Sequence, residues 1–272
     1  MNYCENPCSF LQKTTDEVKK LALDPRSLVI LPLGSVEQHG PHLPLGTDTF
    51  ILEFILTNAC IKSKYRDNIL ILPTIPYGFS HLHTSFSGTI SIESKLLSEL
   101  ITSVGRSTLN MGFKKLLMLS WHGGNYCSMH DAAYALKKEF PKAFIAYISF
   151  IEFILKEVLD LVKPPIYHAD DLETSVMLAI KGRVLEKELE ELKGKHRHIH
   201  HPLRELISLD FTKRARVRIP ILIEEYASDG VIGDVSHSDT DKGAKIIEVA
   251  INNLTEVVDR IVSMEVGVIE ET

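Results

Sequence analysis

Residues 27–48 read SLVILPLGSVEQHGPHLPLGTD, an apolar run that passes directly into a polar loop rich in glycine and proline. The apolar run, Ser27–Leu33, predicts a buried strand. The loop carries Glu37, His39, His42 and Asp48, the ligand types that divalent metals prefer. Open α/β folds place ligand chemistry in loops at the carboxyl ends of strands. This stretch therefore predicts an α/β fold with a metal site at one sheet edge.

Apolar runs alternate with helical patterns over most of the chain. The predicted strands are residues 27–33, 68–73, 114–120 and 143–149. The predicted helices are residues 48–64, 91–111, 125–140, 150–161, 172–181, 185–192 and 240–264. This alternation predicts a mostly parallel sheet with helices on both faces. We therefore expect the loops that follow the four strands to meet at one edge of the sheet. In the first helix, the pattern places Phe50, Ile51, Phe54 and Ile55 on one face.

Composition excludes several classes of protein. The chain has 272 residues, of which 44% are hydrophobic, and a formal net charge of -6. This suffices for one large core, and we expect a single domain over residues 1–272. The acidic balance favours neither nucleic acid nor an anionic membrane as a partner. We find no signal-peptide pattern and no apolar run that could span a bilayer, so we expect a cytoplasmic protein.

The four cysteines do not form a recognisable framework. Cys4, Cys8, Cys60 and Cys127 fit neither a disulfide pattern nor a paired zinc motif. Cys4 and Cys8 are spaced to meet on one helical turn, but two ordinary thiols near a terminus are the better interpretation.

Glu37, His39 and Asp48 form the first candidate ligand group. Alternation along an extended loop directs Glu37 and His39 to the same side. Asp48 stands where a helix is predicted to begin, and a carboxylate there is also favoured by the unpaired N–H groups. A metal ligand and a plain helix cap are thus equally good interpretations of Asp48 taken alone.

Two further groups carry the same kinds of side chain. Residues 121–125 read WHGGN, where paired glycines permit a tight turn and His122 emerges at the same sheet edge as Glu37. Residues 168–175 read HADDLETS, where one of the adjacent aspartates would cap a helix and Glu173 would lie in its first turn. The plain alternatives are a surface turn and a capping cluster. Three loops of this kind at one sheet edge indicate a functional site more strongly than any one of them does alone.

Three other polar segments are less specific. Residues 77–89, YGFSHLHTSFSGT, form a loop that is a candidate pocket lining. Residues 228–234, SDGVIGD, are interpreted as a lid or a simple turn. Residues 193–219 are basic, and we expect a surface excursion or an oligomer contact there. A solvated loop is favoured over a dedicated metal site for the histidines in this segment, which are His196, His198, His200 and His201.

Together these stretches resemble the creatininase (creatinine amidohydrolase) family. The matching stretches are LPLGSVEQHGPHLPLGTD (31–48), FSHLHTSFSGTIS (79–91), WHGGN, HADDLETS and DGVIGDVSHSDTDKG (229–243). They occur in the family's order and cover the chain from about Ser27 to Val262. The resemblance implies a three-layer α/β/α fold with a mostly parallel sheet. It also implies a homohexamer and two divalent metal ions per subunit. Zinc is the expected metal, and manganese and iron are the alternatives.

The resemblance also assigns roles residue by residue. The positions that match metal ligands are Glu37, His39, Asp48 and His122. Among them, Asp48 matches the carboxylate that bridges the two metals. His168 matches a residue that contacts substrate and moves protons, and Glu173 is a candidate catalytic residue, further metal ligand or orienting carboxylate. The candidate substrate contacts are His83, Trp121, Gly123, Gly124 and Asn125.

Two positions depart from the members that hydrolyse creatinine. Those members carry a metal-binding glutamate where this chain has Gly124, and Glu173 is the candidate replacement. They also carry an indole four residues before the catalytic histidine, where this chain has Pro164, and Trp121 is its only tryptophan. Creatinine is therefore not the expected substrate.

The predicted activity is metal-dependent hydrolysis of a C–N amide bond in a small molecule, of the cyclic amide or formamide type. In this interpretation His168 protonates the leaving nitrogen, and Gly123 and Gly124 provide room and backbone donors for the oxyanion. One alternative is a formamidopyrimidine-nucleotide deformylase. Its candidate phosphate contacts are Arg214, Arg216 and Arg218, for which a solvated strand face is the plainer interpretation. A second alternative is a catalytically silent metal-binding assembly protein.

Overall fold

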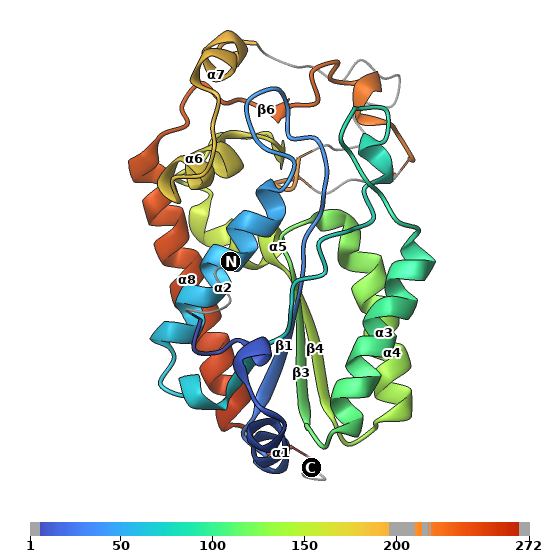
Figure 1. Ribbon diagram of the computed structural model, residues 1–272. Helices are drawn as coiled ribbons and strands as arrows, with labels where there is room; N and C mark the ends of the chain where they lie inside the picture. The colour runs from blue at the N-terminus through green and yellow to red at the C-terminus, as the bar shows by residue number, and fades with distance from the viewer. Residues whose placement is uncertain (1–5, 196–209, 214–216, 218, 267–272) are drawn as a thin grey trace.

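A computed structural model describes residues 6–195, 210–213, 217 and 219–266 of the chain (Figure 1). The predictions for Cys4, for the histidines of residues 196–201 and for Arg214, Arg216 and Arg218 lie outside the described residues.

A four-stranded parallel sheet forms the centre of the fold. Its strands are β1 (Leu28–Leu33), β2 (Ile69–Ile71), β3 (Lys115–Ser120) and β4 (Phe144–Ser149), in the order β2-β1-β3-β4. The register pairs Leu33 with Ser120 and Ser120 with Ser149, so three strands end at the same level. The segments that follow these strands therefore begin at one edge, and the parallel pairing confirms the predicted arrangement.

Helices cover both faces of this sheet (Figure 1). One apolar cluster contains Leu28 and Ile30 of β1 and includes side chains of α2 (Thr47–Lys62), α5 (Phe150–Val158), α6 (Asp171–Ala179), α7 (Glu186–Leu192) and α8 (Thr240–Ser263). The other cluster contains Val29 and Leu31 and includes side chains of α1 (Thr15–Leu23), α3 (Ser94–Asn110) and α4 (Tyr126–Glu139). Successive residues of β1 thus face opposite layers. The predicted three-layer α/β/α arrangement is confirmed.

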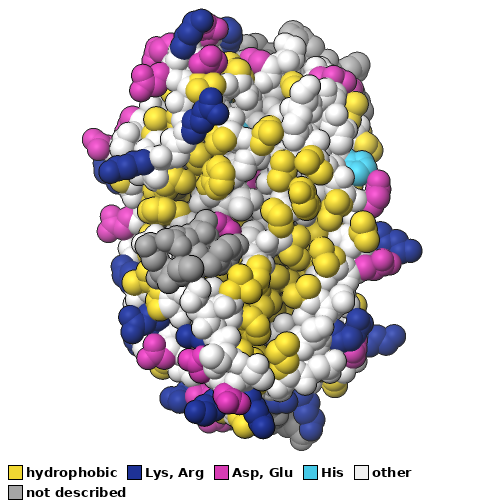
Figure 2. All heavy atoms as spheres, viewed as in Figure 1, with side chains coloured by type: hydrophobic (Ala, Val, Ile, Leu, Met, Phe, Trp, Pro, Cys, Tyr) yellow, Lys and Arg dark blue, Asp and Glu magenta, His cyan; other side chains and the backbone are white. Residues whose placement is uncertain are grey.

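The surface of α2 differs from the prediction. Ile51 and Ile55 are buried, but Phe50 is 48% exposed and Phe54 is 37% exposed. Adjacent residues in a helix point about 100° apart, so only the isoleucine pair faces the sheet. Figure 2 shows hydrophobic side chains gathered on the face of the molecule over α2 and α3.

A short second sheet was not predicted and carries a site residue. Strand β5 (Ile166–His168) pairs in antiparallel fashion with β6 (Ile232–Gly233). This pairing places His168 at the end of a strand, next to the start of α6. The loop expected after Ser149 is absent from the described residues, because α5 begins at Phe150 directly after β4. None of the described helices has the length and apolar character that a membrane crossing requires.

Candidate metal centre

The predicted ligands come together at the carboxyl edge of the sheet. Glu37 and His39 lie in the loop after β1, His122 follows β3, and Asp48 lies in the first turn of α2. All four side chains are buried. Glu37, His39 and Asp48 each offer a ligand atom, and these atoms lie within 4.8 Å of one another. The sheet topology therefore brings together candidate metal ligands that lie in separate segments of the sequence.

Asp48 lies between the two histidines. Its Oδ1 is 3.4 Å from His39 Nε2, and its Oδ2 is 3.4 Å from His122 Nδ1. Gly46 is the N-cap of α2, and the Asp48 side chain accepts a hydrogen bond from Ser35 Oγ instead of capping the helix. The helix-cap interpretation of Asp48 is thus wrong. Two oxygens that face different imidazoles are arranged as a bridging carboxylate requires.

Backbone carbonyls orient both histidines. His39 Nδ1 donates to the carbonyl of Glu37 at 3.1 Å, and His122 Nε2 donates to the carbonyl of Phe79 at 2.9 Å. The second nitrogen of each ring, Nε2 of His39 and Nδ1 of His122, therefore faces the carboxylates. A metal-binding imidazole is typically held in this way, because the hydrogen bond fixes which nitrogen is available to the cation.

Two buried polar atoms of the centre have no hydrogen-bond partner among the described residues. They are Glu37 Oε2 and His39 Nε2. Buried polar groups are nearly always paired, so such atoms require an explanation. Since both belong to the predicted ligand set, a bound cation would satisfy them. The donor set of carboxylate oxygens and imidazole nitrogens fits zinc or manganese.

The charges of the centre also fit a cation. Burial opposes the charge on His39, but Asp48 above all, with Glu173 and Glu37, raises the pKa of His39 to about 10. Burial likewise opposes the charge on His122, and Glu37 and Asp48 nevertheless raise its pKa well above the usual value. Protons on the two imidazoles thus balance the carboxylates in the metal-free protein. A divalent cation would take the place of these protons.

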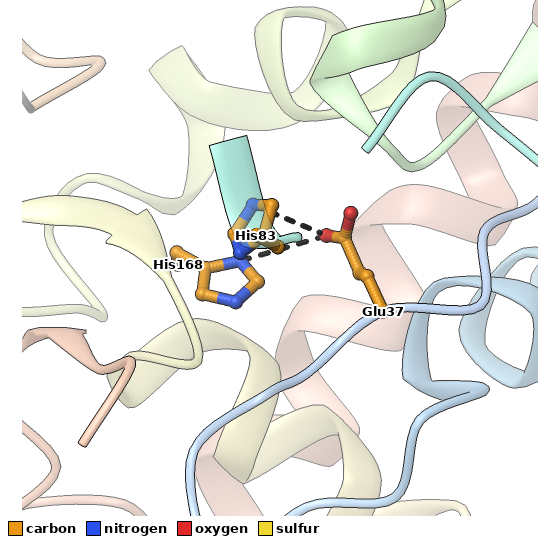
Figure 3. A group of neighbouring side chains, drawn as sticks. All are labelled: Glu37, His83 and His168. Carbon is orange, nitrogen blue, oxygen red and sulfur yellow. Dashed lines mark ion pairs between the residues drawn. The ribbon is translucent and has the colours of Figure 1, made fainter. Parts of the chain in front are cut away.

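His168 and Glu173 reach the centre from β5 and α6. Asp170 is the N-cap of α6 and accepts hydrogen bonds from the backbone N–H groups of Leu172 and Glu173. The capping residue, Asp170, is therefore distinct from the two candidate site residues of this segment, His168 and Glu173. His168 Nε2 donates to the carbonyl of Gln38 at 2.7 Å, and its Nδ1 lies 3.8 Å from Glu37 Oε1. Figure 3 shows the rings of His168 and His83 side by side, facing the Glu37 carboxylate.

Glu173 is held at both carboxylate oxygens. Oε1 accepts from the indole N–H of Trp121 at 3.1 Å. Oε2 accepts from the backbone N–H of Ala169 at 2.7 Å and lies 3.8 Å from His39 Nε2. Burial raises the pKa of Glu173 to about 8. His39, His168 and Glu173 could jointly hold a cation, so Glu173 is in place to supply the carboxylate that Gly124 does not.

The five candidate substrate contacts have different surroundings. His83 is 4% exposed, and its Nε2 lies 3.7 Å from Glu37 Oε1. Trp121 is 1% exposed and is stacked on Phe150, so it reaches the centre through Glu173. Asn125 is also buried, and its amide group donates to the carbonyl of Gly34 and to Ser120 Oγ.

The two glycines of the WHGGN segment also differ. A Cβ on Gly123 would lie 3.6 Å from Phe211, which is ordinary contact distance. A Cβ on Gly124 would lie 2.2 Å from the Phe79 carbonyl oxygen and 2.4 Å from His122 Nε2. A side chain at Gly124 would therefore disturb the hydrogen bond that orients His122. Sequence reasoning missed Ser35 and Gln38, whose only signal was their place in the loop after β1.

Comparison with known proteins shows which family the chain belongs to. A sequence model of the creatininase family, described as creatinine amidohydrolase, matches residues 12–258. A mycofactocin precursor peptide peptidase from Mycobacterium tuberculosis is 38% identical over 117 residues, which is 41% of this chain and 46% of that protein. The chain thus matches about half the length of this relative. A creatinine amidohydrolase from Pseudomonas putida is 22% identical over 250 residues, covering 85% of this chain and 88% of that protein.

A third relative is a 2-amino-5-formylamino-6-ribosylaminopyrimidin-4(3H)-one 5'-monophosphate deformylase from Methanocaldococcus infernus. It is 28% identical over 127 residues, which is 46% of this chain and 52% of that protein.

Solved structures share the fold. A crystal structure of creatinine amidohydrolase (creatininase) matches with a TM-score of 0.78 at 18% identity, over 94% of this chain and 98% of that chain. A mutant creatininase of the Zn-Zn type and a manganese creatininase each match with a TM-score of 0.75, over 94% of this chain and 99% of theirs, at 17% and 18% identity. Because the family model covers nearly the whole chain, the predicted membership is confirmed: the chain belongs to the creatininase family of amidohydrolases.

Proposed function

We propose that this protein is a metal-dependent hydrolase that cleaves a C–N amide bond in a small molecule, of the cyclic amide or formamide type. The observation that carries the proposal is the position of Asp48, whose two oxygens face His39 and His122. Two divalent ions per subunit fit this arrangement. The residues that would hold them are Glu37, His39, Asp48, His122 and Glu173. Zinc is the expected metal, and manganese and iron are the alternatives. When bound, such ions polarise a carbonyl group and lower the pKa of a water molecule.

His168 supplies the proton transfers of the reaction. Its Nε2 proton is held by the Gln38 carbonyl, so its Nδ1 carries the lone pair that faces Glu37. Burial lowers the pKa of His168 well below its usual value, which keeps the ring neutral. Nδ1 can therefore accept a proton as water adds to the amide carbon. The same proton then passes to the leaving nitrogen as the C–N bond breaks.

A panel of substrates tests the proposed reaction. Protein reloaded with Zn²⁺ or Mn²⁺ is incubated with cyclic amides including creatinine, N-formyl compounds, a formamidopyrimidine nucleotide and a short peptide. We expect hydrolysis of a cyclic amide or an N-formyl compound, lost after chelation. Turnover of the nucleotide alone would identify the deformylase alternative. Cleavage of the peptide alone would contradict the proposed bond class. Full metal content without any turnover would favour a silent assembly protein.

Changing Glu173 tests its place in the centre. Glu173→Gln keeps the size of the side chain but cannot supply the carboxylate that would bind a cation next to His39. If Glu173 replaces the carboxylate missing at Gly124, the variant will bind one of its two metal ions at least about 10–100-fold more weakly. Titration with Zn²⁺ followed by elemental analysis measures this. Glu53→Gln, a buried change on α2 that contacts Thr74, is the matched control. Unchanged affinity for both ions would make Glu173 an orienting residue instead.

The proposed assembly is a homohexamer. The exposed Phe50 and Phe54 support a contact between copies, since large apolar side chains on one face commonly mark an interface. Sedimentation analysis of the purified protein measures the number of subunits. The cytoplasmic location and the single domain over residues 1–272 stay predictions from the sequence.

A further inference from the structure

Gln38 lies in sequence between two predicted ligands, yet its side chain contacts other groups. Its Oε1 accepts from the backbone N–H of Gly40 at 2.8 Å. Its Nε2 lies 2.9 Å from His83 Nδ1, 3.0 Å from the carbonyl oxygen of Gly230 and 3.1 Å from His168 Nε2. One amide group therefore contacts two histidines of the centre and a turn from the distant segment 228–234.

The partners of Gln38 fix the orientation of its amide. A backbone N–H can only donate, so the atom facing Gly40 is the oxygen. A backbone carbonyl can only accept, so the atom facing Gly230 is the NH₂ group. One amide proton goes to the Gly230 carbonyl. The second is then available for an imidazole nitrogen that carries a lone pair.

That nitrogen belongs to His83. His168 Nε2 is already committed as a donor to the Gln38 backbone carbonyl at 2.7 Å, so it cannot also accept from the amide. His83 Nδ1 therefore accepts the second amide proton. A neutral imidazole with a lone pair on Nδ1 carries its proton on Nε2.

His83 thus differs from the other histidines of the centre. Glu37 Oε1 lies within 4.0 Å of one ring nitrogen of each of His39, His83, His122 and His168. Backbone carbonyls accept the outer proton of the other three, so the inner nitrogen of each can offer a lone pair to a cation once the second protons of His39 and His122 have left. His83 is held by a donor instead, and so it presents an N–H group there.

We infer that Gln38 is a positioning residue that keeps the proton of His83 on Nε2. His83 then acts as a hydrogen-bond donor to the carbonyl oxygen of the substrate and not as a metal ligand. The inference rests on the proposed amidohydrolase function. It separates two interpretations that distance alone leaves open, since Glu37, His83 and His168 are close enough to share a cation. A fixed N–H aimed at a carbonyl oxygen stabilises the negative charge that develops there in the transition state.

The turn at Gly230 completes this arrangement. Gly230 has a φ of +79°, and a Cβ there would fall 1.9 Å from Gln38 Oε1. The glycine thus permits the close approach that brings its carbonyl to the amide. Val231, the next residue, is 1% exposed. Within the described residues, segment 228–234 is therefore a packed support for Gln38, which fits the simple-turn interpretation better than the lid.

Nuclear magnetic resonance of the metal-free protein tests the tautomer. Two-bond ¹H–¹⁵N correlations of ¹⁵N-histidine-labelled protein show which ring nitrogen carries the proton, and His83→Asn identifies the His83 signals. We expect the Nε2–H form in the wild type. Gln38→Glu has the same shape but no amide protons, so its carboxylate will accept from His83 and move the proton to Nδ1. Gln12→Glu, the same change at an exposed position, should leave the spectrum unchanged.

Two outcomes would overturn the inference. One is a wild-type His83 that carries its proton on Nδ1 or on both nitrogens. The other is loss of bound Zn²⁺ in His83→Asn, which would make His83 a ligand. If Gln38→Glu does not fold, the wild-type spectrum and the metal content of His83→Asn still decide.

Kinetics then tests the role in the reaction. With a substrate found in the panel, His83→Asn and Gln38→Glu should keep their metal and their KM but lose about 10²–10³-fold in kcat, as for other oxyanion donors. An unchanged kcat in His83→Asn would refute the donor role. If the wild type hydrolyses no amide while His83 shows the Nε2–H form, the proposed function fails and the tautomer assignment stands.

Discussion

Asp48→Ala is expected to empty the metal centre and abolish turnover. The side chain of Asp48 is 2% exposed, and its two oxygens face His39 and His122. Removing it takes away a carboxylate that offers a separate oxygen to each of these histidines. We expect about two ions per subunit in the wild type, as in two-metal hydrolases, and a clear loss in the variant. Elemental mass spectrometry of the purified proteins measures both.

A matched variant separates loss of metal from loss of fold. Glu53→Gln changes a buried carboxylate of the same helix, outside the predicted ligand set, and should keep full metal content. Asp48→Ala with both full metal content and activity would show that the bridging assignment is wrong. A folded wild type that takes up no metal after reloading would instead point to a family member whose role is assembly.

The parallel sheet could be predicted because its strands are continuous apolar runs. Strands β1 and β3 are buried along their full length, and apart from Lys115 and Ser120 at the two ends of β3 their side chains are apolar on both faces. Strands β5 and β6 are only three and two residues long, which is too short for a periodic signal. Helix α1 was missed although the sequence contains a helix-start signal there, because Thr14 and Glu17 form a capping box.

The residues of the centre could be predicted from the sequence, but the hydrogen bonds that orient them could not. Parallel strands end at one edge, so Glu37 and His122 had to approach each other once β1 and β3 were recognised. The partner of each ring nitrogen depends on carbonyls elsewhere in the chain, such as Phe79 for His122. Spacing along the sequence contains no information about these contacts. Gln38 was missed for the same reason, since its partner Gly230 lies far along the chain.

His168→Asn is expected to keep the metal and lose the reaction. His168 is committed at Nε2 to the Gln38 carbonyl, so only Nδ1 can exchange protons at the centre. A positioned acid–base group contributes about 10²–10⁴-fold to the rate, and we expect kcat to fall by that amount. His237→Ala, which changes an exposed histidine near Lys163, is the control and should leave kcat unchanged.

The pH profile and the metal content distinguish proton transfer from metal binding at His168. Burial lowers the pKa of His168, so its base form persists at neutral pH and is lost only as the pH falls through that lowered value. Wild-type kcat/KM should therefore decline on the acid side below the usual histidine range of about 6.5. His168→Asn should lack this decline in its residual rate. A variant that instead loses bound metal would make His168 a ligand, because His39, His168 and Glu173 are close enough to share a cation.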